Sequence, residues 1–159
     1  MTPALHISIA QESDAAEIAQ MSRDLIEANL PWTWRPERVS RAIKAEHMNV
    51  AVVRERQTLM AFGIMEYWDD DAHLVLFAVR PSSQRQGIGT AVLQWLENSA
   101  LVAGSQRIRV EARRDNLAAR NFYNEHGYHE LKIKARMYSG VLDGIQLEKW
   151  ISTAARSDA

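Results

Sequence analysis

The fold of this chain is decided by residues 74–90, which read LVLFAVRPSSQRQGIGT. Residues 74–79 are apolar without a break, which predicts a central strand covered on both faces. Pro81 ends this strand, and a loop with two glycines opens a helix over 87–103. The first turn of a helix has unpaired N–H groups and a partial positive charge, which suits phosphate oxygens. The alternative is that Gly87 and Gly89 only permit a tight turn.

The elements on either side of this stretch predict a mixed α/β domain, of the α+β class. The helix over 87–103 joins two strands, 72–79 and 107–112, which should therefore be parallel with a right-handed crossover. Apolar alternation and turn residues predict further strands over 5–9, 49–54, 59–67, 128–137 and 142–150. Apolar residues at helical spacing predict helices from 11–14 to Pro31, over 37–47 and over 117–126.

Composition limits the functions that are open to this chain. Its 159 residues suit one domain, which we expect over 1–151, with a frayed tail over 152–159. The 19 Lys and Arg residues balance 20 Asp and Glu residues, which disfavours binding to nucleic acid by bulk charge. The absence of cysteine excludes disulfides, thiolate metal sites and a cysteine nucleophile. No segment resembles a signal peptide or a membrane span, so we expect a cytoplasmic protein without a membrane partner.

Two motifs resemble those of the GNAT superfamily of acetyl-CoA-dependent N-acetyltransferases. The string V-x-P-x-x-Q-R-Q-G-I-G ends on the family signature Q/R-x-x-G-x-G/A, which Gln84, Gly87 and Gly89 provide. A second motif, NLAARNFY, follows at 116–123, and Gly127-Tyr128 comes after it. The subgroup with the strongest likeness is the protein N-terminal acetyltransferases of the ribosomal-protein alanine type. The resemblance implies a mixed, mostly antiparallel sheet of six to seven strands, with a splayed parallel pair and about four helices.

The resemblance also implies a binding site for acetyl-CoA as the acetyl donor. The pantetheine arm should lie in the gap between the parallel strands, against backbone groups of the central one. The loop and the first helical turn should hold the pyrophosphate. The implied coenzyme-binding residues are Phe77, Ala78, Val79, Gln84, Arg85, Gln86, Gly87, Ile88, Gly89, Thr90, Asn116 and Arg120. The alternatives are that Asn116 only caps a helix and that Arg85 and Arg120 are solvated surface residues.

Three residues are candidates for proton transfer. Tyr123 matches the family's general acid, which protonates the leaving thiolate; the alternative is a packed aromatic beside Phe122. Glu111 ends the strand that borders the cofactor gap and matches the base of the N-terminal acetyltransferases. Glu66 is a second candidate base, on the strand beside the central one. We rank Glu111 ahead of Glu66, and the alternative for either residue is a salt-bridged strand position.

The acceptor site is expected at Trp32, Trp34 and the turn that contains Tyr138. An equal alternative is that the two tryptophans clasp the first two helices together. The acidic run 69–71 is interpreted as a solvated turn. The five histidines lack metal-site spacing, so they are interpreted as surface or packing residues and no metal is expected.

The predicted function is therefore acetyl transfer from acetyl-CoA to a primary amine. The acceptor is a protein N-terminus or lysine, or a small-molecule amine. Because the chain has no cysteine, an acetyl-cysteine intermediate is excluded, and direct transfer in a ternary complex is expected. The alternative from another class is a non-catalytic acyl-CoA-binding sensor. The oligomeric state stays open, a homodimer included.

Overall fold

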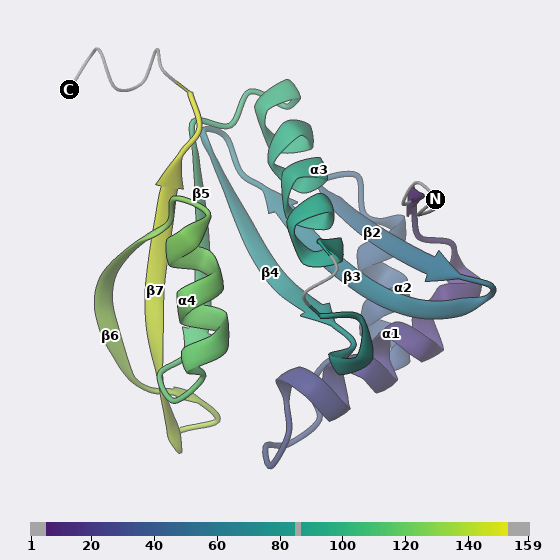
Figure 1. The fold of residues 1–159 in the computed structure, drawn as a ribbon, viewed down its shortest axis with the longest axis horizontal. Coiled ribbons are helices and arrows are strands. Elements are labelled where there is room, and N and C mark those ends of the chain that lie inside the picture. Colours follow the sequence, from purple (N-terminus) through teal and green to yellow (C-terminus); the bar gives the residue numbers. More distant parts are fainter. Residues whose placement is uncertain (1–5, 85–86, 153–159) are drawn as a thin grey trace.

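A computed structural model describes residues 6–84 and 87–152 of the chain. These residues form one seven-stranded sheet in the order β1-β2-β3-β4-β5-β7-β6, in which only β4 and β5 pair in parallel (Figure 1). The strands are β1 (Ile7–Ile9), β2 (Met48–Glu55), β3 (Thr58–Tyr67), β4 (Asp71–Val79), β5 (Arg107–Arg113), β6 (His129–Tyr138) and β7 (Leu142–Trp150). The helices are α1 (Ala15–Met21), α2 (Pro36–Lys44), α3 (Ile88–Val102) and α4 (Leu117–Glu125). The predicted fold class and the predicted parallel pair are confirmed.

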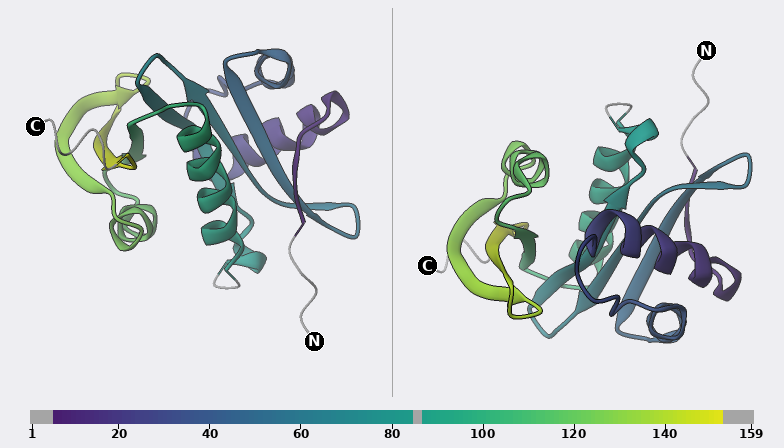
Figure 2. Two further views of the ribbon diagram at one scale, coloured as in Figure 1. Left: turned by 90° about the horizontal axis from the view of Figure 1, so that it is seen from above. Right: turned by 90° about the horizontal axis from the view of Figure 1, so that it is seen from below.

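The helices cover the two faces of the sheet in pairs (Figure 2). On one face, buried residues of α3 and α4 pack in a core with strand residues such as Leu74 and Val110. On the other face, α1 and α2 pack in a second core against strand residues such as Phe62 and Leu76. None of the helices in the described ranges is long and apolar enough to cross a membrane.

The segment predicted as one helix from 11–14 to Pro31 is not a regular α-helix. A 3₁₀ turn over Glu12–Asp14 leads into α1, and the chain then widens into a π-helical turn over Ser22–Ile26. The Glu27 N–H closes that turn on the Ser22 carbonyl at 2.8 Å, and the Glu27 carboxylate accepts from the Ser22 hydroxyl at 3.0 Å. Asn29 then adopts a left-handed conformation, with φ of 67°, which ends the helical path before Pro31.

The parallel pair is splayed, as expected. β4 and β5 are paired only from Asp71↔Arg107 to Leu74↔Val110, whereas β4 remains paired with β3 as far as Val79. A bulge lies where the partners of β3 step from Leu76 to Leu74, which leaves Val75 as the extra residue of β4. A bulge bends and twists the strand that carries it. The strands therefore part beyond Leu74, and Figure 1 shows the gap between them.

The closed end of this pair carries an ion-pair network. Arg107 donates to both carboxylate oxygens of Asp71, at 3.1 and 2.8 Å, and to Glu148 of β7 at 3.1 Å. Asp71 thus begins β4 in an ion pair, whereas Asp69 and Asp70 are exposed as the solvated turn predicted. The hydrogen bonds from Arg107 hold the pKa of Asp71 below its ordinary value, although burial acts the other way.

We expect Asp71→Asn to destabilise the fold near neutral pH, by on the order of 1 kcal/mol because the pair is partly screened by solvent. A carboxyl with a lowered folded-state pKa contributes stability above its unfolded pKa and loses that contribution as the pH falls through the folded value. The difference from the wild type should therefore close as the pH drops below about 4. Urea unfolding at several pH values measures it, with exposed Asp69→Asn as the control. A constant difference across the pH range would contradict this assignment.

Candidate active site

A cleft of about 910 Å³ opens where β4 and β5 diverge. Its lining comes from β4, β5, the start of α3, α4, the segment after α1 and the β6–β7 turn. Between Val75 and Val79, about 13 Å of β4 has no β5 partner. An extended ligand can pair with such a free strand edge through backbone hydrogen bonds. Phe77, Ala78 and Val79, predicted to bind the coenzyme, all line this cleft.

The start of α3 forms the end of the cleft beyond Val79. Gly87 is the N-cap, with φ of 78° in the left-handed region, and no side chain of the described residues caps the first N–H groups of the helix. A Cβ at Gly89 would lie 3.2 Å from Val79 Cγ2 and 3.4 Å from Phe122 Cε2, so this turn fits closely against β4 and α4. Ile88 is buried in the core. The arrangement offers free, positively polarised N–H groups to an anion.

The loop before α3 is held against the end of β4. The Gln84 side-chain amide donates to the Val79 carbonyl at 3.0 Å, and Gln84, predicted to bind the coenzyme, also lines the cleft. Arg85 and Gln86, also predicted to bind the coenzyme, lie outside the described residues.

His126 joins the two helices that border this end of the cleft. Its Nδ1 bonds the Phe122 carbonyl at 2.7 Å, and its Nε2 bonds the Thr90 hydroxyl at 2.9 Å. Because a carbonyl only accepts, Nδ1 carries a hydrogen, and in the neutral ring Nε2 accepts from Thr90. The interpretation of all histidines as surface or packing residues missed this role, and the sequence offers no spacing signal for a contact across 36 positions.

Tyr123 lies between the core and the cleft. Its side chain is only 5% exposed, and its ring packs against Phe77, Phe122 and Tyr128 with centroid distances of 5.6–6.3 Å. Tyr123 also lines the cleft, and none of the described residues makes a hydrogen bond to its hydroxyl. Burial raises the Tyr123 pKa, and the nearby phenol of Tyr138 adds to this effect. The phenol is therefore protonated at neutral pH and available as a donor.

Glu111 stands at the point where the strands part. In β5 the residues Ile108, Val110 and Ala112 are buried in the core, so Glu111 points to the opposite face of the sheet. Its carboxylate bonds His73 Nε2 at 2.5 Å and pairs with Lys134 Nζ at 3.6 Å. Burial raises the Glu111 pKa, but the hydrogen bond and charge of His73, with the charge of Lys134, outweigh it and hold the pKa below its ordinary value.

The two candidate glutamates differ in position. Glu111 lines the cleft, together with His73, which sequence reasoning did not select. Glu66 is not among the lining residues, and its carboxylate faces His47 at 3.4 Å. The structure thus brings Glu111, and not Glu66, together with Tyr123.

The predicted acceptor residues divide between two roles. Trp34 is buried in the core under α1 and α2 and also lines the cleft. Trp32 donates its indole N–H to the Ala19 carbonyl at 3.1 Å and lies outside the lining, which fits the clasp alternative. Tyr138 lines the cleft, where burial and the charge of Glu111 raise its pKa to about 12, against an opposite effect of Arg113.

A buried glutamate that sequence reasoning missed shapes this wall of the cleft. Glu27 is 8% exposed and accepts from the Thr33 hydroxyl at 2.5 Å, from the Thr33 N–H at 2.8 Å and from the Trp34 N–H at 3.2 Å. These bonds fix the segment between α1 and α2 against the cleft. A buried carboxylate with several partners is the signal, and only the folded chain shows it.

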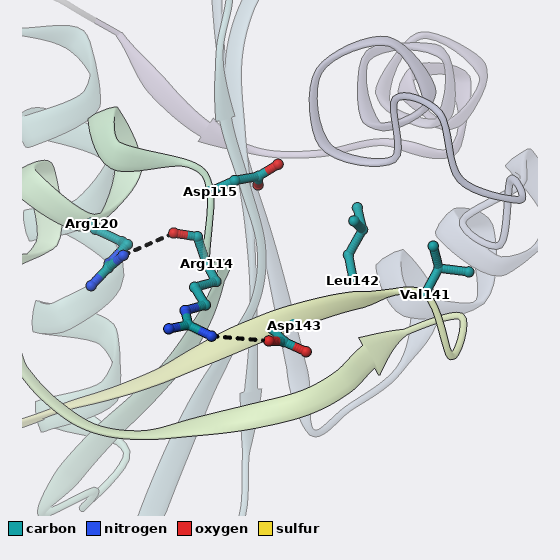
Figure 3. Close-up of a pocket in the computed structure, with 6 residues that line it drawn as sticks. All are labelled: Arg114, Asp115, Arg120, Val141, Leu142 and Asp143. Carbon is teal, nitrogen blue, oxygen red and sulfur yellow. Dashed lines mark hydrogen bonds and ion pairs between the residues drawn. The ribbon is translucent and has the colours of Figure 1, made fainter.

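Asn116 and Arg120 were both predicted to bind the coenzyme, but only Asn116 lines the cleft. Asn116 caps α4, accepting from the Ala119 N–H at 3.0 Å, and it also lines the cleft. Arg120 lies instead in a separate depression, where it donates to the Arg114 carbonyl at 2.8 Å (Figure 3). It also pairs with Glu130 at 2.8 Å. Its guanidinium is thus occupied by protein partners away from the cleft. Among the described residues, no cluster of His, Asp and Glu could hold a metal ion.

Comparison with known proteins agrees with this geometry. An uncharacterized N-acetyltransferase of Methanocaldococcus jannaschii is 33% identical over 101 residues, or 63% of this chain and 64% of the relative. The [ribosomal protein bS18]-alanine N-acetyltransferase of Escherichia coli K12 is 35% identical over 80 residues, or 50% of this chain and 54% of the relative. The matches therefore span less than two thirds of the length of either curated relative.

Solved structures share the fold over nearly the whole chain. The ribosomal-protein-S18-alanine N-acetyltransferase of Escherichia coli superposes with a TM-score of 0.79 at 25% identity, covering 94% of this chain and 96% of that one. Ard1 from Thermoplasma volcanium superposes with a TM-score of 0.81 at 18% identity, covering 94% and 99%. The family described as the acetyltransferase (GNAT) family matches residues 18–128. The chain belongs to the acetyltransferase (GNAT) family.

Proposed function

We propose that this protein transfers the acetyl group of acetyl-CoA to the α-amine at the N-terminus of a polypeptide. One observation carries the proposal: the free edge of β4 runs from the start of α3 into a cleft whose lining includes both Tyr123 and Glu111. One cleft therefore combines an anion-binding helix start, a strand edge and two groups suited to proton transfer. The sequence match to two N-acetyltransferases supports the reaction class.

The donor acetyl-CoA fits the polar groups of the cleft. The free N–H groups of the first turn of α3, from Gly87 to Thr90, would donate hydrogen bonds to the pyrophosphate. The unpaired edge at Phe77, Ala78 and Val79 would pair with the amide groups of the pantetheine arm. Asn116 lies within reach as a cleft residue, and Arg85 and Gln86 keep their proposed role on the family resemblance.

Acetyl transfer requires a polarised thioester carbonyl and an acid for the leaving thiolate. A backbone N–H near Val79 would polarise the carbonyl, which is worth about 3 kcal/mol of transition-state stabilisation. Tyr123 would donate a proton to the thiolate as the C–S bond breaks, since its phenol is protonated and free of protein partners among the described residues. Glu111 would take part in removing the proton from the acceptor ammonium.

The acceptor would enter beside the segment that Glu27 fixes and the β6–β7 turn that carries Tyr138. The relatives named for ribosomal protein bS18 alanine support a polypeptide that begins with alanine as the acceptor. The lack of cysteine excludes an acetyl-cysteine intermediate and supports direct transfer in a ternary complex as the simplest mechanism.

Two measurements test the proposal. Acetyl-CoA and CoA should raise the melting temperature of the protein and ATP should not, because ligand at about 100 times its Kd adds about 2.7 kcal/mol of stability. Thiol release from acetyl-CoA should then depend on a peptide with a free N-terminal alanine. The same peptide with a blocked N-terminus and an internal lysine, and a polyamine, complete the panel. Coenzyme binding without acceptor-dependent thiol release would contradict the proposal and favour a sensor.

A further inference from the structure

We propose that His73 is the group that takes the proton from the acceptor ammonium and that Glu111 is the positioning residue for its ring. This inference rests on the proposed acetyl transfer to an amine. It differs from proton removal by Glu111 itself, because it puts the imidazole and not the carboxylate in contact with the acceptor.

Strands β4 and β5 place His73 and Glu111 on either side of the last residue pair that joins them. Leu74↔Val110 is the last pair of β4 and β5; His73 immediately precedes it in β4 and Glu111 immediately follows it in β5. Ala72 and Leu74 are buried in the core under α3, so His73 points to the opposite face, which is also the face of Glu111. Both residues line the cleft at the apex from which the free edge of β4 departs.

The hydrogen bonds of His73 and Glu111 indicate which of the two groups is free to accept a proton. Nε2 of His73 lies 2.5 Å from a carboxylate oxygen of Glu111, and an ionised carboxylate can only accept, so Nε2 carries the hydrogen. In the neutral ring Nδ1 then has a lone pair, and no described residue bonds it. The other oxygen of Glu111 faces Lys134 Nζ at 3.6 Å. The Glu111 carboxylate is thus engaged by two donors, whereas Nδ1 of His73 offers a lone pair that no described residue uses.

The proton balance is simple. An N–H bond of the acceptor ammonium breaks as the Nδ1–H bond of His73 forms, which leaves a neutral amine and an imidazolium beside the Glu111 carboxylate. The amine then forms its C–N bond to the acetyl carbon as the C–S bond breaks. Tyr123 gives a proton to the thiolate, and the second proton lost by the nitrogen restores the phenol. His73 returns its own proton to solvent, since its side chain is 32% exposed.

Other charged groups surround the ring and must be held constant in a test. On β3, Glu66 is the Cα partner of His73 and pairs with His47. On β5, Arg109 is its Cα partner on the other side. The remaining groups are Asp71 on β4, paired with Arg107, and Lys134 and Tyr138 on β6.

The first test is His73→Ala, assayed for thiol release with acetyl-CoA and an alanine peptide. The turnover number should fall about 10²-fold or more, the KM for acetyl-CoA should stay within about twofold, and the acidic limb of the pH–rate profile should vanish. Added imidazole should restore part of the rate in proportion to its free-base form. His129→Ala, on the exposed strand β6, is the control and should change none of these. An unchanged rate and acidic limb, or a loss that imidazole does not restore, would overturn the assignment.

A second test needs no activity. NMR of the His73 ring should show the Nε2–H tautomer in the wild type, and Glu111→Ala should remove this preference because the carboxylate that accepts from Nε2 is gone. A ring protonated on Nδ1 alone, or one whose tautomer ignores Glu111→Ala, would overturn the inference alone. A wild type that releases no thiol with any acceptor would instead overturn the proposed function and the inference with it.

Discussion

Replacing Tyr123 by phenylalanine should lower the turnover number by about 10²- to 10⁴-fold while the KM for acetyl-CoA changes little. The substitution removes only the hydroxyl, and the ring keeps its packing against Phe77, Phe122 and Tyr128. No described residue bonds that hydroxyl, so the fold loses no hydrogen bond among them. The loss should therefore fall on protonation of the leaving thiolate. Steady-state thiol release, with the melting temperature as a check on folding, measures it.

The control for this variant is Tyr128→Phe. Tyr128 is a neighbouring buried phenol whose hydroxyl donates to Glu97 at 2.8 Å, and it does not line the cleft. Its loss should lower stability, by about 1–3 kcal/mol, because a hydrogen bond to a charged group is removed and Glu97 keeps Lys149, at 3.1 Å, as its partner. Its turnover number should stay near that of the wild type. Equal turnover in the two variants would remove Tyr123 as the acid.

A valine at Gly89 should weaken the binding of acetyl-CoA by roughly 10- to 100-fold, the cost of one lost hydrogen bond to a charged group. A Cβ there already lies 3.2 Å from Val79 Cγ2, and the branched methyls of valine come closer still. The first turn of α3 must then move away from the end of β4, and its free N–H groups move with it. Isothermal titration with acetyl-CoA and with CoA measures the affinity.

The matched control is Gln94→Val, an exposed position in the middle of the same helix. This substitution adds a β-branched residue to α3 but leaves the first turn of the helix in place. The affinity for acetyl-CoA should therefore remain within about twofold. A Gly89→Val protein that binds acetyl-CoA as tightly as this control would mean that the start of α3 does not hold the coenzyme.

The sequence predicted the part of the fold that depends on local pattern and chain order. The apolar run 74–79 fixes a buried central strand, and the helix after it forces the parallel pairing with β5. The two glycines at the start of α3 have different physical reasons, a left-handed φ at Gly87 and a close approach at Gly89. The first reason is local, whereas the second depends on Val79 and Phe122, which lie 10 and 33 positions away along the chain.

The sequence could not predict what depends on the bulge and on long-range contacts. The π-helical turn after α1 reflects the bonds of Glu27 to residues five to seven positions away, which outweigh the apolar spacing that suggested a regular helix. His73 and Glu111 are 38 positions apart and meet because the register of β4 and β5 sets them on either side of the last pair, Leu74↔Val110. The same limit applies to Arg120, whose partner Glu130 lies on β6 and holds it away from the cleft.

The most direct test of acetyl transfer to an amine follows the acetyl group itself. The protein is incubated with acetyl-CoA that carries an isotopically labelled acetyl group and with a peptide that begins with alanine, and both chains are followed by mass spectrometry. The label should appear on the α-amine of the peptide, with one thiol released for each acetyl group and no label on the protein at any time. Label that resides on the protein before it reaches the peptide, or thiol release without labelled amine, would contradict the account.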